Sequence, residues 1–214
     1  MAKTRRLENN FILLHIRENI AVYSAVTILF ILGVTGGALA VRRLDSGQIN
    51  ELNSILGNFR DYLSVDKPLN QAAILKRSLL QNGLFILLLW LCGSFAPGFI
   101  PAAALVFYRG FTIGFTVGFL ARRSALGGII FALAAVLPQN LLFVPATIAA
   151  GVFSFSASLL LLDRRLQHRR LPYRSFFPEY TLAIFLAALF LVAGSLAEAL
   201  ITPVFMRAAV PFIQ

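Results

Sequence analysis

The feature that most constrains this chain is a succession of apolar runs, each close to the length that crosses a bilayer. A transmembrane α-helix needs about 20 consecutive apolar residues. Runs of that kind occupy positions 20–41, 79–100, 102–121, about 141–162 and about 180–201. Only 13% of the 214 residues are charged, whereas soluble domains carry about 25%. The sequence therefore predicts an all-α, polytopic transmembrane helical bundle of about five spans, forming a single integral membrane domain over residues 1–214.

The polar segments between the runs predict the topology. Residues 1–19 combine basic side chains with apolar residues at helical spacing, which is typical of an amphipathic helix at the cytoplasmic interface. Segment 163–178 is strongly basic, and the positive-inside rule places it in the cytoplasm. Five spans then leave segment 42–77 and the C-terminus outside the plasma membrane. In a six-span arrangement, residues 125–139 would also cross the membrane. Arg122 and Arg123 would then lie in the cytoplasm, but one of the basic segments that five spans place in the cytoplasm would lie outside, so we prefer five spans.

Segment 42–77 is predicted to form a small extracytoplasmic hairpin of amphipathic helices. Its apolar residues recur every three or four positions, as on one face of a helix. Asp45 followed by Gln48 resembles a capping box at the start of the first helix. Asp66 followed by Pro68 predicts the start of the second helix. The candidate partner surface on this hairpin consists of Leu52, Leu56, Phe59 and Tyr62.

A glycine stripe in the third apolar run predicts close helix packing. Gly110, Gly114 and Gly118 recur at intervals of four, which places them on one side of a helix where a second backbone can approach. The second backbone is either the protein's own broken helix or a second copy of the chain, which would make a homodimer. Internal packing is the preferred interpretation. Arg109, beside the stripe, either snorkels to an interface or marks the true start of the span.

The run from 125 to 162 is too long for one ordinary span and contains helix-breaking residues. Those residues are Pro138, Gln139, Asn140 and Pro145. The pattern predicts a short leading helix, a polar break, and a full span from about 141. Backbone groups freed inside a membrane need partners from protein or trapped water, and the two amides can supply them. The break is therefore either a structural kink or a binding and gating element.

The residues needed for common kinds of chemistry are sparse. Cys92 is the only cysteine, and His15 lies far from His168, so neither a disulfide nor a metal site is predicted. The acidic residues of the extracytoplasmic segment are spread along an amphipathic helix, which is no scaffold for a pair of catalytic carboxylates. We predict no catalytic residues, no cofactor and no enzyme activity. The net charge of +10 is clustered beside apolar runs, which favours membrane lipids over nucleic acid as its partner.

Specific sequence motifs resemble those of the stage II sporulation protein M family. The resemblance rests on three stretches, 114–120 (GFTVGFL), 136–142 (VLPQNLL) with Pro145-Ala146 after it, and 78–82 (SLLQN). It implies a cell-membrane protein of endospore-forming bacteria that acts in engulfment of the forespore. Members of the family are regarded as the scaffold for two peptidoglycan-degrading partners, sporulation proteins D and P. The family is not credited with catalysis, and it offers no catalytic residues to transfer.

Two functions of different classes are compatible with these features. The first is a non-enzymatic scaffold that recruits and localises peptidoglycan-degrading proteins, as the resemblance implies. The second is a channel, a transporter or a subunit like an ATP-binding cassette permease, which would use the broken helix near Pro138 to Asn140. Broken helices with polar residues near the midplane build substrate sites in many transporters.

Overall fold

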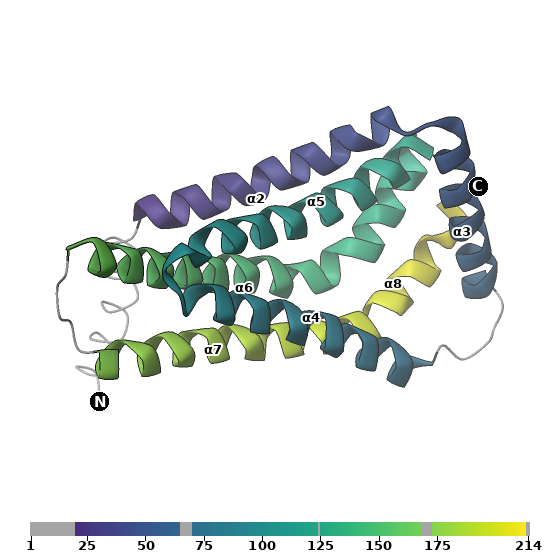
Figure 1. The fold of residues 1–214 in the computed structure, drawn as a ribbon. Coiled ribbons are helices and arrows are strands. Elements are labelled where there is room, and N and C mark those ends of the chain that lie inside the picture. The colour runs from purple at the N-terminus through teal and green to yellow at the C-terminus, as the bar shows by residue number, and fades with distance from the viewer. Residues whose placement is uncertain (1–19, 65–69, 124, 168–172, 213–214) are drawn as a thin grey trace, which may run out of the picture.

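The computed structural model describes residues 20–64, 70–123, 125–167 and 173–212, and the regular structure within these ranges is entirely helical (Figure 1). The predicted interfacial helix at 1–19 and part of the basic loop at 163–178 lie outside the described residues. The helices are α2 (Ile20–Ala40), α3 (Ser46–Ser64), α4 (Gln71–Gly93), α5 (Phe99–Arg123), α6 (Ala125–Gln167), α7 (Tyr173–Leu200) and α8 (Thr202–Ala209). Short 3-10 turns occupy Val41–Arg43, Ala96–Gly98 and Val210–Phe212.

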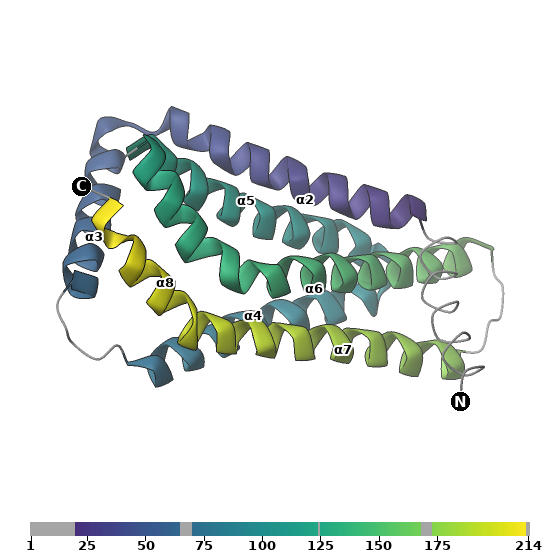
Figure 2. The ribbon, with the colours of Figure 1, turned by 180° about the vertical axis from the view of Figure 1, so that it is seen from behind.

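The prediction of five membrane spans is confirmed. Five helical segments in the described ranges are long and apolar enough to cross a bilayer: Ile20–Arg43, Gln71–Gly93, Ala96–Arg122, Leu126–Leu166 and Phe177–Ala209. They run along one another in a single bundle, while α3 lies across one of its ends (Figures 1 and 2). The run that could have supplied a sixth crossing is part of one long helix, α6.

The predicted break in α6 is a bend within a continuous helix. Both Pro138 and Pro145 lie inside α6, so the expected division into a short helix and a separate span is wrong. The helix changes direction visibly along its course in Figures 1 and 2. At the bend, Asn140 Nδ2 donates a hydrogen bond to the Val136 carbonyl oxygen at 2.7 Å. Pro138 removes the hydrogen bond that the Ala134 carbonyl would otherwise accept, so the Asn140 bond is an additional contact near the proline and does not replace the lost bond.

The glycine stripe of α5 packs against α2. A β-carbon added at Gly110 would overlap the Phe30 carbonyl oxygen, and one added at Gly118 would lie 2.9 Å from Ala38 Cα. Gly33 and Gly37 of α2 meet the α5 backbone in the same manner. The two helices therefore approach backbone to backbone, which small residues permit. The second backbone anticipated beside the stripe is the first span, rather than the bent helix.

Segment 42–77 forms one helix across the end of the bundle, followed by the start of the second span. The predicted capping box is present in part, because the Asp45 amide donates to Gln48 Oε1 at 3.1 Å before α3 begins. The second helix, α4, starts later than predicted: Asn70 is its N-cap and accepts a hydrogen bond from the Ala73 amide at 3.0 Å. The predicted hairpin of two surface helices is wrong for the described residues, because α3 packs against α8 and the turn Val210–Phe212 and α4 is itself a membrane span. Residues 65–69, between α3 and α4, lie outside the described residues.

The residues after the last predicted span, which ends at about 201, form a further helix, α8. The last span, α7, ends at Leu200, and α8 then runs obliquely towards α3 (Figure 2). Pro203 lies in the first turn of α8, a position where its missing amide hydrogen costs little. Thr202-Pro203 is therefore the local signal that could have predicted this helix.

We expect the end that carries α3 and α8 to face outward. Five spans place the basic segments 1–19 and 163–178 on the side opposite α3, and the positive-inside rule predicts that this side is cytoplasmic. Labelling tests this orientation directly. In a Cys92→Ala background, cysteines replacing the exposed Asn58 or Ala208 should react with a membrane-impermeant maleimide in intact cells. A cysteine replacing the exposed Arg165 should react only after permeabilisation. The reverse pattern would invert the proposed topology.

Candidate functional site

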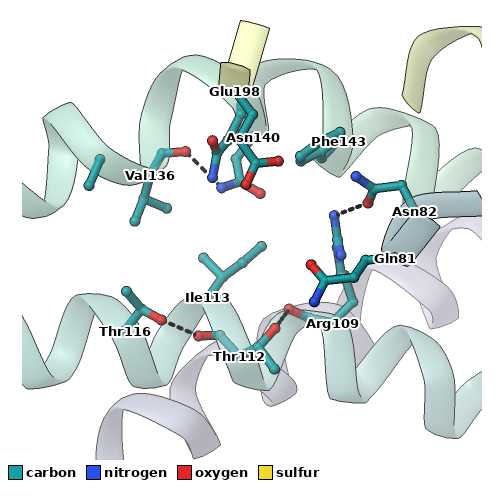
Figure 3. Close-up of a pocket in the computed structure, with 12 residues that line it drawn as sticks. Gln81, Asn82, Arg109, Thr112, Ile113, Thr116, Val136, Asn140, Phe143 and Glu198 are labelled. Carbon is teal, nitrogen blue, oxygen red and sulfur yellow. Dashed lines mark hydrogen bonds between the residues drawn. The ribbon is translucent and has the colours of Figure 1, made fainter. Parts of the chain in front are cut away.

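A polar cavity lies inside the bundle, between α4, α5, α6 and α7 (Figure 3). Its volume is about 370 Å³, within the range of about 300–1,000 Å³ typical of small-molecule sites. The lining is rich in amides and hydroxyls and includes one cation and one carboxylate. The residues that line it are Gln81, Asn82, Arg109, Thr112, Ile113, Thr116, Ala135, Val136, Gln139, Asn140, Phe143 and Glu198.

Asn82 connects three helices at the wall of this cavity. Its Nδ2 donates to Ser78 Oγ on α4 and to Ser195 Oγ on α7, both at 3.1 Å. Its Oδ1 accepts a hydrogen bond from Arg109 Nη2 on α5 at 2.8 Å. Asn82 and both serines are buried. Every polar atom of the Asn82 amide group is thus hydrogen-bonded, as a buried amide in an apolar bundle requires.

Arg109 lies well inside α5 and neither snorkels to an interface nor begins the span. Its guanidinium packs over the rings of Phe85 and Phe143, with its central carbon 5.4 and 5.0 Å from the two ring centres. Its one hydrogen bond within the described chain is the bond to Asn82, and its buried Nε has no partner. A charged residue at membrane depth is costly, and such residues commonly mark functional sites. Most of the donor capacity of this guanidinium is unused.

Glu198 supplies the opposite charge on another side of the cavity. In the view of Figure 3, Glu198 is drawn towards α6, while Arg109, Gln81 and Thr112 are drawn on the other side of the cavity. One of its oxygens accepts a hydrogen bond from Ser78 Oγ at 2.5 Å. Ser78 thereby links the Glu198 carboxylate to the Asn82 amide. The described chain contains no ion pair between Arg109 and Glu198, so both charges can face a ligand.

The amides predicted at the bend both lie at the cavity. Gln139 Oε1 accepts a hydrogen bond from Thr202 Oγ1 at 3.2 Å, which ties the bend of α6 to the junction between α7 and α8. Asn140 bonds within its own helix. Pro145 lies elsewhere, in an apolar groove beside α7. The sequence analysis therefore found the α6 wall of the cavity but missed the network of Asn82, Arg109 and Glu198, although Asn82 lies in one of the three stretches that carry the family resemblance.

The predicted partner surface is only partly free. Leu52 and Leu56 line an apolar groove of about 280 Å³ together with residues of α5, α6 and α8. Leu56 packs onto the small core around Phe131 at this end of the bundle. Ile55 also borders the groove, and 58% of its surface is exposed. The side chains of Phe59 and Tyr62 lie outside the described part of the chain.

The chemistry of the cavity is that of a binding site. Arg109 can bind an anionic group, Glu198 can bind a cation, and the surrounding amides and hydroxyls can orient both. Within the described ranges, no group of three His, Cys, Asp or Glu residues could hold a metal ion.

Comparison with known proteins gives one match. The family sequence model described as Stage II sporulation protein M matches residues 26–203, which include all four helices that line the cavity but only the start of α8. No curated protein and no solved structure matches the chain.

Proposed function

The chain belongs to the stage II sporulation protein M family, and we propose that it is a non-enzymatic membrane scaffold of forespore engulfment. In this role it recruits and localises the peptidoglycan-degrading proteins D and P that the family is regarded as holding. The spans anchor the scaffold in the plasma membrane, and the end that carries α3 and α8 receives the partners.

The observation that carries this proposal is the position and surface of α3. This amphipathic helix lies across the end of the bundle and packs there against α8 and the turn Val210–Phe212. Ile55 remains largely exposed at an apolar groove that α3 shares with α5, α6 and α8. An exposed apolar residue at the edge of an apolar groove is suited to receive an apolar side chain of a partner.

Replacing Ile55 by glutamate is expected to reduce co-purification of the two partners by about tenfold, since loss of an interface hot spot costs about 2 kcal/mol or more. The measurement is the amount of each partner recovered with the tagged protein from solubilised membranes of sporulating cells. Asn50→Glu is the matched control, because Asn50 is also exposed on α3 but does not line the groove. Full recovery of both partners with Ile55→Glu would contradict the proposed surface.

A transporter subunit is the second candidate, and the polar cavity is the observation that favours it. Gln139 and Asn140 line this cavity at the bend of α6, where a solute pathway would need polar groups. Solute flux into proteoliposomes that is lost when both amides become leucine would favour transport. The folded state of that variant must be checked, because Gln139 also holds Thr202.

A further inference from the structure

We propose that the polar cavity binds the headgroup of an aminoethyl phospholipid, phosphatidylethanolamine, with its phosphate at Arg109 and its ammonium at Glu198. One acyl chain of the same lipid lies in an apolar groove that continues from the cavity between α4 and α5. This role is separate from partner recruitment, because the residues involved lie within the spans rather than on α3.

The first step is the incomplete bonding of Arg109. A guanidinium has five N–H donors and binds phosphate in a two-pronged geometry. In the described chain, Arg109 donates one hydrogen bond, and two aromatic rings hold its position. A bound phosphate would supply both hydrogen-bond acceptors and negative charge to this cation inside the membrane.

The second step is the presence of a carboxylate in the same cavity. Glu198 would repel a ligand that carries only negative charge, but it attracts an ammonium. It is held in place by Ser78, which leaves carboxylate lone pairs for further donors. A ligand with a phosphate and a nearby primary ammonium therefore matches the charges on both sides of the cavity.

The third step is the groove that adjoins the cavity. It has a volume of about 450 Å³ and shares Gln81, Arg109 and Thr112 with the polar cavity. Its remaining lining is mainly apolar, from Leu84, Phe85, Leu88, Leu105 and Tyr108. Leu84 and Tyr108 are strongly exposed on the outside of the bundle, so the groove opens towards lipid. A polar cavity that leads directly into an apolar groove fits a molecule with a charged head and a hydrocarbon chain.

Native mass spectrometry of the purified full-length protein tests the proposal. The probes are phosphatidylethanolamine, phosphatidylglycerol and phosphatidylcholine with identical acyl chains. We expect phosphatidylethanolamine to bind about tenfold more tightly than the other two, because phosphatidylglycerol has no ammonium and the choline headgroup cannot donate a hydrogen bond to Glu198. Equal binding of the three lipids would overturn the proposal.

Two substitutions separate the roles of the charges. Arg109→Gln should weaken the binding of all three lipids, because each of them carries the phosphate that Arg109 is proposed to bind. Glu198→Gln removes the repulsion of negative charge, so selectivity should shift from phosphatidylethanolamine towards phosphatidylglycerol. Because a shift in preference requires a folded protein, this result is independent of any loss of stability. Unchanged selectivity in Glu198→Gln would also overturn the proposal.

A third substitution tests the groove and the source of the headgroup. Leu84→Trp should block the groove and weaken lipid binding by about tenfold while free phosphoethanolamine still binds the cavity. Leu80→Trp is the matched control, because Leu80 is 65% exposed on the same helix but lines neither space. Free phosphoethanolamine that binds the native protein as tightly as the lipid does would overturn the lipid assignment and identify a water-soluble zwitterion as the ligand.

Discussion

Replacing Gly114 by leucine is expected to separate α2 from α5 and to leave little stably folded protein. A β-carbon at this position would overlap the Val34 carbonyl oxygen and lie 2.6 Å from its carbonyl carbon. Those are backbone atoms, so the overlap can be relieved only by moving one helix away from the other. Overpacking in cores costs about 1–3 kcal/mol and sometimes more. We expect at least the upper part of that range, since α2 meets α5 through glycines along its length.

The measurement is the thermal stability of the detergent-purified protein, followed by size-exclusion chromatography. Gly83→Leu is the matched control, because no heavy atom other than those of its own helix and chain neighbours lies within 4 Å of a β-carbon built at Gly83. It should leave the melting temperature nearly unchanged. A Gly114→Leu protein with unchanged stability but an altered oligomeric state would contradict internal packing and favour the homodimer instead.

Asn82→Leu is expected to destabilise the protein by about 2–3 kcal/mol, the scale of a hydrogen bond to a charged group. The substitution removes the acceptor for Arg109 and two donors to buried serines. Arg109 would then keep its charge at membrane depth without the one hydrogen-bond acceptor that it has in the described chain. Thermal stability in the same detergent measures the loss, and Gln81→Leu is the control, since Gln81 lines the same cavity from an exposed position.

A second substitution shows whether Arg109 is the cause. Removing one partner of a buried charged interaction is strongly destabilising, whereas replacing both by apolar residues is often nearly neutral. The double variant Asn82→Leu with Arg109→Leu should therefore recover much of the stability lost in Asn82→Leu. Strictly additive effects of the two substitutions would show that the groups are not coupled.

Much of the candidate site could not be predicted from the sequence, although parts of it could. Gln139 and Asn140 stand beside Pro138, and polar residues next to a proline in an apolar run are a local signal. Arg109 was visible as an unusual charge, but its neighbours in the chain do not reveal its partners. Asn82 and Glu198 come from helices distant in sequence, and a single sequence contains no information about which faces of those helices meet.

The sequence by itself determined the features that depend on local composition and spacing. The lengths of the apolar runs specified five spans, because a helix must be long enough to satisfy its own backbone across the bilayer. The spacing of Asp45 and Gln48 specified the start of α3, because their hydrogen bond joins residues three apart.

Only the tertiary structure decided which helices meet and how they are oriented. The glycine stripe of α5 predicted close packing with a second backbone. Which helix supplies that backbone, here α2, depends on the tertiary arrangement of the spans. The two prolines predicted an interruption of α6, yet the helix continues through both of them with a bend. The polar cavity exists because four helices bring Asn82, Arg109, Gln139 and Glu198 together, and such long-range contacts leave no periodic signal in the chain.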